Sequence, residues 1–471
     1  MIERWIFVAF GPYNLLMDFS LMACLLFIAQ MLRSKIKLLQ NLYIPSSLIA
    51  GFLGLFGGPQ FLNIIPFSAQ ASGYAYMLVV VLFASLFIGN EDKSSIKKVV
   101  NEVGDTFTVN LAAEFGQFGA ALLMGVFVLS WMFPTLQESF AILLPAGFCG
   151  GHGYAAAIGG TLEKGGFEGA VTIGQTFATL GLLTGVIGGI IIINYATRVG
   201  ATRLVKSASQ LPESMRTGMI TPDEQQSMGK STTSPMAIDP LAWHTSLVLI
   251  ATAGGYYATN ALQAWAAQYI PNISIPMMSV SMLAGVVLQM ILRMTKTDRY
   301  VDKQIITRVG SSVSDYLVCF GVATIKISIV VQYAMPILIM SLFGLAFVLF
   351  YLFVISRKLF HNFWFERGIF IYGWTTGVVA IGVTLLRVVD PEFKSNTLQD
   401  YGTAYVFIAI VEVFLVSVTP VLVLQGLGLA SGLVLVALAA VLLIATAVKY
   451  GINKQKMNEL RPGEKEVIEA H

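Results

Sequence analysis

The sequence predicts an all-α polytopic membrane protein, built from two inverted repeats of five transmembrane helices, each with a re-entrant hairpin, plus one extra C-terminal helix. Three observations lead to this fold class. Of the 471 residues, 56% are hydrophobic and only 12% are charged, whereas about a quarter of the residues of a soluble domain are charged. The apolar residues gather into runs of about 20, the length that crosses a bilayer as a helix. Similar parts then recur in the two halves of the chain.

Eleven windows are long and apolar enough to span a membrane. The N-terminal stretch is expected to be retained, because Glu3 and Arg4 precede no short apolar core with a small-residue cleavage site. The predicted spans lie at 14–32, 42–58, 72–90, 108–131, 168–197, 241–267, 276–292, 312–331, 333–356, 402–425 and 427–448.

Basic residues predict the orientation, because Lys and Arg stay on the cytoplasmic side of a membrane. Clusters follow the first, third and fifth spans, and the connections 57–72 and 265–272 between spans contain no charged residue. This alternation predicts an N-terminus outside and a cytoplasmic C-terminus. The first three clusters are Arg33, Lys35 and Lys37; Lys93, Lys97 and Lys98; and Arg198, Arg203 and Lys206.

Two apolar segments, 138–164 and 365–388, are interrupted by small residues and are predicted to be re-entrant hairpins; they are called the first and the second hairpin below. A full crossing by the first hairpin would place the cluster from Arg198 to Lys206 outside, against the charge rule. Irregular backbone at membrane depth is tolerated only where it is buried in protein or lines an aqueous cavity. Both hairpins are therefore candidates for function.

The two halves of the chain resemble each other weakly. YIPSSLIAGFLG (43–54) is similar to SIPMMSVSMLAG (274–285), and the distance from the proline to the hairpin break is 106 residues in the first half and 101 in the second. Opposite orientation of the halves predicts an inverted repeat. The predicted parts are a first repeat (1–199), a cytoplasmic linker (200–240), a second repeat (241–425), an extra helix (426–448) and a cytoplasmic tail (449–471).

This organisation is typical of secondary transporters, in which broken helices meet near the bilayer midplane. No Walker motif, HExxH or GxSxG occurs, so the sequence does not indicate an ATP-driven pump or an enzyme of those classes. A net charge of +3 indicates no nucleic-acid surface, and three scattered cysteines indicate no disulfide framework.

The strongest local motif is PAGFCGGHGYAAAIGG (145–160) in the first hairpin. Adjacent glycines let the backbone turn sharply, so that amide groups approach a ligand, and the start of the following helix favours an anion. Close helix packing is the alternative reading of any single glycine. His152 is interpreted as a donor to a substrate carboxylate or as a stabiliser of the loop. The predicted substrate-binding residues of this hairpin are Gly150, Gly151, His152, Gly153 and Tyr154.

GGHG, followed from Thr176 by TFATLGLLTGVIGG, resembles the sodium/glutamate symporter family of bacteria. The resemblance implies Na⁺-coupled uptake of glutamate, with Na⁺ as the coupling ion and no other cofactor. It also implies a homodimer in the bacterial inner membrane that works by an elevator-like movement. The second hairpin, IYGWTTGVVAIGVTLLRVVD (371–390), departs from the glycine-rich family pattern.

In the second hairpin, Thr375, Thr376 and Gly377 are candidates for contacts to substrate or Na⁺, although threonines at such a break also cap half-helices. Small residues spaced four or five apart also serve plain helix packing. Arg387 is interpreted either as a partner of a substrate carboxylate or as a side chain that reaches the cytoplasmic surface.

Cation binding or coupling is assigned to Thr176, Thr179, Glu412 and Asp315. Glu412 lies in the middle of YVFIAIVEVFLVSV, where an ionisable side chain is by default a functional hypothesis, with a structural hydrogen bond as the alternative. Asp315 and Lys326 are predicted to share one face of one span. Weaker polar candidates within spans are Asp18, Ser46, Ser47, Glu114 and Gln117.

The sequence leads to three alternative hypotheses for the function. The first is Na⁺-coupled symport of glutamate or a related anionic amino acid or dicarboxylate. The second is H⁺-coupled carboxylate transport through Glu412. The third, a channel or a membrane scaffold, does not require the duplicated hairpins.

Overall fold

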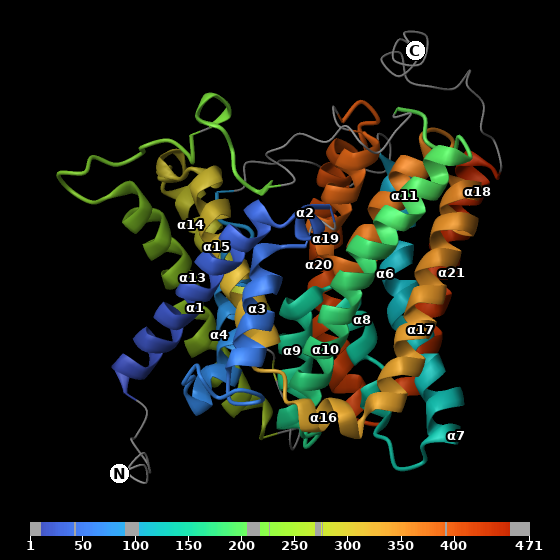
Figure 1. Ribbon diagram of the computed structural model, residues 1–471, viewed down its shortest axis with the longest axis horizontal. Helices are drawn as coiled ribbons and strands as arrows, with labels where there is room; N and C mark the ends of the chain where they lie inside the picture. The colour runs from blue at the N-terminus through green and yellow to red at the C-terminus, as the bar shows by residue number, and fades with distance from the viewer. Residues whose placement is uncertain are drawn as a thin grey trace. The chain divides into compact units, whose positions relative to one another are not determined.

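The computed structural model describes residues 11–452 except 42–43, 90–102, 205–216, 226, 269–274, 276 and 391–392. In this described part the chain forms helices and turns, without a β-strand. Contacts divide the chain into two compact units that each draw on both halves of the sequence (Figure 1). Unit 1 comprises Met1–Asn90, Arg216–Ala261 and Met277–Val330, and unit 2 comprises Glu91–Met215, Leu262–Pro276 and Val331–His471.

The described residues include nine helices that are long and apolar enough to cross a membrane. They confirm the predicted class of polytopic membrane protein. Shorter apolar helices lie at Ser46–Gly57, Ala69–Ser85 and Glu138–Phe148. The nine helices are Pro12–Lys35, Gly104–Met132, Ala170–Arg198, Met277–Met294, Lys303–Ala323, Ala334–Leu359, Trp364–Val389, Phe407–Leu424 and Gly428–Tyr450.

Unit 1 has an apolar interior with a few well-paired polar groups. Buried Asp18 accepts hydrogen bonds from the Ser68 backbone at 2.9 Å and from the Tyr74 hydroxyl at 2.8 Å, so its charge is compensated within the helices around it. Its helices are α1 (Pro12–Lys35), α2 (Lys37–Asn41), α3 (Ser46–Gly57), η1 (Ala69–Gly73), α4 (Tyr74–Ser85), η5 (Pro222–Glu224), most of α13 (Pro240–Ala266), α14 (Met277–Met294), η6 (Asp298–Tyr300), α15 (Lys303–Ala323) and most of α16 (Ile327–Gln332).

Unit 2 contains both hairpins and three long helices with a π-helical segment each. Its elements are α6 (Gly104–Met124) continued by η2 (Gly125–Leu129) and α7 (Ser130–Met132); η3 (Glu138–Phe140); α8 (Leu143–Phe148); α9 (Gly151–Lys164); α10 (Ala170–Leu183) continued by η4 (Thr184–Gly188) and α11 (Gly189–Arg198); α17 (Ala334–Phe350) continued by η7 (Tyr351–Ser356) and α18 (Arg357–Leu359); α19 (Trp364–Val389); α20 (Thr397–Leu424); and α21 (Gly428–Tyr450).

A π turn leaves carbonyl groups outside the regular helical pattern, and such turns are frequent at functional sites. In η4 the carbonyl oxygen of Thr184 accepts a hydrogen bond of 2.8 Å from the hydroxyl of Tyr372 on α19. The irregular part of this long helix is thereby tied to the second hairpin.

Both predicted hairpins fold as helix–turn–helix. In the first, α8 and α9 are separated by Cys149 and Gly150 and pack on each other and on α10. In the second, α19 is broken at Gly377 and Val378, whose backbone angles are not helical. A Cβ atom on Gly373 would lie 2.6 Å from the Cα atom of Gly382, so the two halves of α19 run back along each other.

The predicted span 312–331 is wrong at both ends. The helix α15 starts at Lys303 because the Asp302 side chain accepts hydrogen bonds from the backbone of Gln304 and Ile305, and polar residues follow this cap. It ends at Ala323, so Lys326 precedes the separate helix α16 and does not share a helix with Asp315. Several residues used for orientation and repeat matching lie outside the described residues: Tyr43, Lys93, Lys97, Lys98, Lys206, Pro276 and the tail from 453.

Candidate functional site

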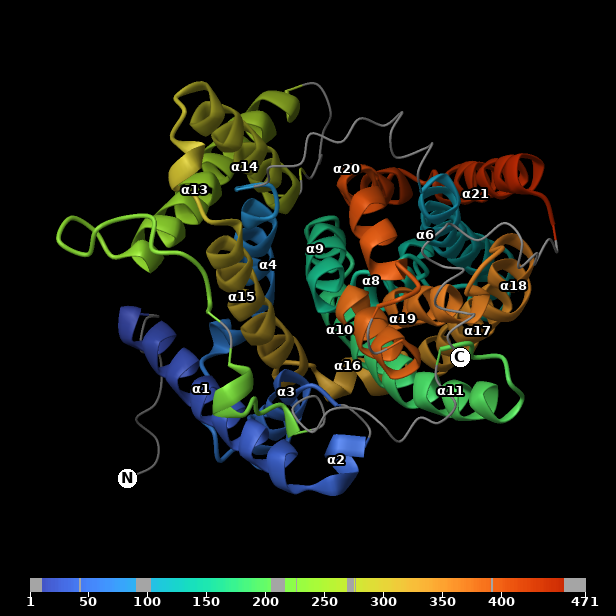
Figure 2. The same ribbon diagram turned by 90° about the horizontal axis from the view of Figure 1, so that it is seen from above.

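The tips of the two hairpins meet inside unit 2. Gly151 at the first tip has φ +57°, and Val378 at the second has φ +66°. A Cβ atom on Gly151 would lie 2.5 Å from the Cγ1 atom of Val378, so only glycine fits between the turn and its neighbour. A β-branched residue with positive φ is strained, and such strain gathers at ligand sites and switch regions. The helices α8, α9, α10 and α19 pack on one another, and Figure 2 shows them grouped together in unit 2.

Two helix starts lie at the junction. The helix α9 begins at Gly151, and the second half of α19 begins after Val378. The first backbone N–H groups of a helix have no carbonyl partner within it, and the start of a helix has partial positive charge. The junction is therefore suited to an anionic group such as a carboxylate.

The four predicted threonines of α10 and α19 offer hydroxyl oxygens as acceptors, which suit a cation rather than an anion. Each donates its hydroxyl proton to the carbonyl four residues earlier in its own helix, so its oxygen is left as an acceptor for an external donor or cation. On α10, Thr176 donates to Thr172 at 2.8 Å and Thr179 to Gln175 at 2.9 Å. On α19, Thr375 donates to Ile371 and Thr376 to Tyr372, both at 2.7 Å. All four threonines are buried.

His152 packs on α10 and is nearly fully buried, with 3% of its surface exposed. Its Nε2 atom lies 3.2 Å from the Thr179 oxygen. Because the Thr179 hydroxyl proton already goes to the Gln175 carbonyl, we assign the proton of this contact to His152 Nε2. The Gln175 amide donates to the His152 carbonyl at 3.1 Å, while its side-chain oxygen is buried and has no hydrogen-bond partner in the described part of the chain. His152 thus fixes the first hairpin against α10.

One helix, α6, contacts both hairpins through a buried polar stripe. The Gln117 amide donates to the Thr375 carbonyl at 3.1 Å, and its oxygen accepts from the thiol of Cys149. The Asn110 oxygen accepts from the Trp374 indole at 2.8 Å. A single rigid element therefore positions both sides of the junction.

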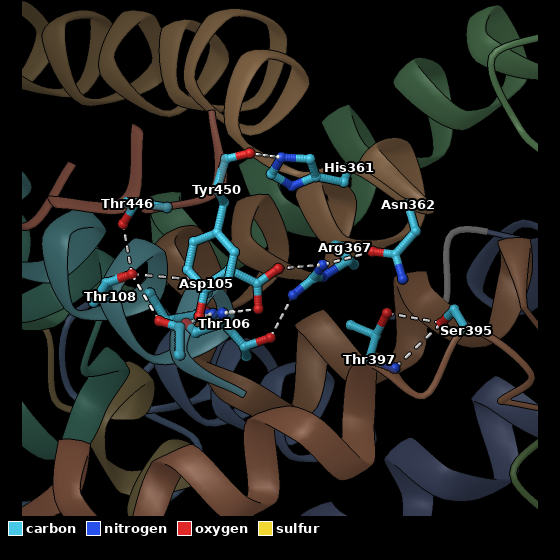
Figure 3. A network of polar contacts seen from close by, with 12 residues as sticks. Asp105, Thr106, Thr108, His361, Asn362, Arg367, Ser395, Thr397, Thr446 and Tyr450 are labelled. Carbon is cyan, nitrogen blue, oxygen red and sulfur yellow. Dashed lines mark hydrogen bonds and ion pairs between the residues drawn. The ribbon is translucent and has the colours of Figure 1, made fainter. Parts of the chain in front are cut away.

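The same stripe continues to an ion pair at the start of α6 (Figure 3). Arg367 on α19 is 2.8 Å from Asp105 and donates to Asn362 at 2.8 Å and to the Thr106 hydroxyl. Its guanidinium carbon also lies 4.0 Å from the centre of the Phe360 ring. With 3% of its surface exposed, Arg367 anchors the first half of the second hairpin to α6.

Glu412 on α20 is connected to the first hairpin. Its Oε2 atom accepts hydrogen bonds from the Tyr154 hydroxyl at 2.8 Å and from the Tyr405 hydroxyl at 3.1 Å. Tyr154 lies in the first turn of α9, directly after GGHG. Two residues that were predicted for different roles, substrate binding and coupling, are therefore in direct contact.

Two other predicted site residues are not part of the hairpin tips. Arg387 is in the last turn of α19, with its guanidinium 5.1 Å from the centre of the Phe393 ring, and the helix break is at Gly377. Asp315 is an exposed residue of α15 in unit 1 and pairs with Ser47, whereas the hairpins belong to unit 2.

Sequence reasoning did not single out Asn110, Gln175, Tyr401 and Tyr405. Asn110 could have been predicted from the sequence, because the polar residues Thr106, Asn110, Glu114 and Gln117 recur at helical spacing in an apolar span. In the structure all four side chains are at most 3% exposed.

Apolar helices long enough to cross a membrane, together with two hairpins whose tips meet, are typical of secondary transporters. Residues 13–364, about three quarters of the chain, match the family model described as Sodium/glutamate symporter. The chain therefore belongs to the sodium/glutamate symporter family. The match ends at the start of α19, so most of the second hairpin and all of α20 lie beyond the matched residues. None of the curated proteins matches the chain.

Proposed function

We propose that the protein couples the inward movement of Na⁺ to the uptake of glutamate or a related anionic amino acid or dicarboxylate. The observation that supports this most is the meeting of two hairpin tips, Gly151 and Val378, in a member of the sodium/glutamate symporter family. Broken helices that meet in this way hold substrate and coupling ion together in secondary transporters.

In the proposed site, the two helix starts at Gly151 and after Val378 bind the substrate carboxylates through backbone N–H groups. The candidate Na⁺ ligands are the hydroxyl oxygens of Thr176 and Thr179 on α10 and those of Thr375 and Thr376 on α19. The Thr376 oxygen lies beside Gly185, which is nine residues beyond Thr176, so Thr176 and Thr376 do not bind the same ion. These oxygens accept rather than donate, which suits a hard cation. Gly150 precedes α9 and Gly377 lies in the break of α19, so both belong to the turns that bring the backbone to the ligands, whereas Gly153 is already in the first turn of α9.

Transport is proposed to proceed by alternating access, with unit 2 moving the bound ligands in an elevator-like step. The inverted repeat, a homodimer in the bacterial inner membrane, an N-terminus outside and a cytoplasmic C-terminus belong to the same proposal. Coupling to H⁺ through Glu412 is the second candidate, because Glu412 is bonded to the first hairpin by Tyr154.

Uptake by the full-length protein in proteoliposomes tests the proposal. We expect radiolabelled glutamate to accumulate when a Na⁺ gradient is imposed and not when a proton gradient alone is imposed. Accumulation with protons alone, lost in Glu412→Gln, would establish the second candidate instead. Ion conductance without accumulation of any anionic amino acid or dicarboxylate would contradict both.

A further inference from the structure

Glu114 is a buried carboxyl group that receives no hydrogen bond from the residues that the structure describes. It lies in the middle of α6, only 1% of its surface is exposed, and neither carboxylate oxygen has a partner among those residues. The neighbouring Gln117 donates to the Thr375 carbonyl, and neither of its amide protons forms a hydrogen bond with Glu114. An ionised carboxylate in such a place has a large desolvation cost, whereas a protonated one does not.

Glu412 is the opposite case. It is also buried, but two tyrosine hydroxyls donate to it, which favours the ionised form. Glu114 and Glu412 lie on α6 and α20, which pack on each other, and their carboxyl groups interact electrostatically. Two neighbouring carboxylates in a dry site do not both ionise easily.

The groups around this pair are neutral. Tyr154 faces it from α9, Tyr401 and Tyr405 from α20, and Cys149 from the turn of the first hairpin. The helices α8 and α17, which also pack on α6, contain no ionisable residue. The other ionisable groups on elements packed on α6 fall into two sets. Those of the first set have partners of their own: Tyr351 donates to the Val109 carbonyl, Tyr372 donates to the Thr184 carbonyl, Arg367 pairs with Asp105, and Glu366 accepts from the Arg203 backbone. Those of the second set lie at helix ends: Asp400 in the first turn of α20, Arg387 in the last turn of α19, and Lys449 and Tyr450 at the end of α21.

We propose that Glu114 and Glu412 form a proton-binding pair that holds one proton, on Glu114, and that Tyr154 transmits the state of the pair to the first hairpin. While Glu412 is ionised, its bond to the Tyr154 hydroxyl is charge-assisted and holds the first turn of α9. A second proton, taken from water, neutralises Glu412 and weakens this bond. Acidification therefore releases the first hairpin. The role of the hairpin in transport rests on the proposed function, but the location of the proton does not.

Infrared difference spectroscopy of the full-length protein in lipid tests the location of the proton without requiring transport. At neutral pH we expect a carbonyl-stretch band of a protonated carboxylic acid that shifts in D₂O. Glu114→Gln is expected to remove a component that Glu412→Gln leaves in place. Glu366→Gln, at another buried glutamate, and Glu163→Gln, at an exposed one, are expected to retain the same component. Loss of that component in Glu412→Gln alone, or its absence from the wild type, would overturn the proposal.

The proposed link between the carboxyl pair and the first hairpin is tested by the alkylation rate of Cys149. In this experiment Cys24 is replaced by serine and Cys319 by alanine, so that Cys149 is the thiol that reacts. Comparison with Tyr154→Phe at each pH cancels the pH dependence of the thiol itself. At neutral pH we expect alkylation of Cys149 to be about tenfold slower with Tyr154 present, since a bond to a charged group is lost in the variant. The ratio of the two rates should approach one as the pH falls. A ratio of one at every pH would contradict the link.

Discussion

Replacement of Gly151 by alanine is expected to lower substrate uptake on the order of 100-fold, because a displacement of about 1 Å at a ligand site has effects of this size. The new Cβ atom would lie 2.5 Å from Val378 Cγ1, so the two hairpin tips must separate. The protein should still fold, since the change is confined to the two turns. Uptake in proteoliposomes, normalised to the amount of monodisperse protein, measures the effect.

Gly166→Ala is the matched control. Gly166 also has positive φ, at +97°, but no atom lies within 4 Å of its ideal Cβ position. The Gly166→Ala variant also places an alanine at positive φ, but its Cβ atom meets no neighbouring atom. We expect its uptake to be within about twofold of wild type, because substitutions that disturb no contact have small effects.

A second substitution should restore activity. The Cβ atom of Val378 is 3.9 Å from the ideal Cβ position of Gly151, an ordinary van der Waals distance, so Val378→Ala removes the clashing methyl group. Gly151→Ala combined with Val378→Ala is expected to recover most of the uptake. Wild-type uptake by Gly151→Ala alone, or equal loss in Gly166→Ala, would show that contact of the tips is not required.

Replacement of Arg367 by alanine is expected to destabilise unit 2 by about 3–5 kcal/mol, the usual cost of breaking a buried ion pair. The change removes the ion pair with Asp105 and the hydrogen bonds that Arg367 donates to Asn362 and to the Thr106 hydroxyl. The midpoint of thermal unfolding in detergent should fall by on the order of 10 °C. Na⁺-dependent uptake should fall with it, because the first half of the second hairpin loses its anchor.

Arg357→Ala provides the comparison. Arg357 is exposed, and its guanidinium carbon is 5.7 Å from the centre of the Trp364 ring, so its removal should cost about 1 kcal/mol or less. Replacement of Arg367 and Asp105 together by apolar residues should recover part of the stability, because no unpaired charge then remains. Equal midpoints for Arg367→Ala and wild type would exclude the anchoring role.

Composition and hydrophobic run length were sufficient to predict the helical membrane fold, because the bilayer imposes one length and one secondary structure on every span. They placed the helix 170–198 to within a few residues. They failed at α15, whose first turns are polar and whose start is set by the cap at Asp302. A hydropathy window does not detect a helix that begins before its apolar part.

The glycine motif at 150–153 was recognisable because a sharp turn needs residues without a side chain. The break of the second hairpin was also predicted, at Gly377. The place of Val378 at its tip was not, because Val378 adopts a conformation that β-branched residues avoid, and only the surrounding packing holds it there. The pairing of Glu114 with Glu412 was equally inaccessible. Each was visible as a polar residue in an apolar span, but their proximity depends on the packing of α6 against α20.

Binding of glutamate to the purified protein, measured by calorimetry in Na⁺ and in choline at equal ionic strength, tests the central claim most directly. If the hairpin junction holds substrate and Na⁺ together, glutamate should bind at least about tenfold more tightly in Na⁺, and Na⁺ should bind more tightly by the same factor when glutamate is present. The same affinity in Na⁺ and in choline would contradict the account.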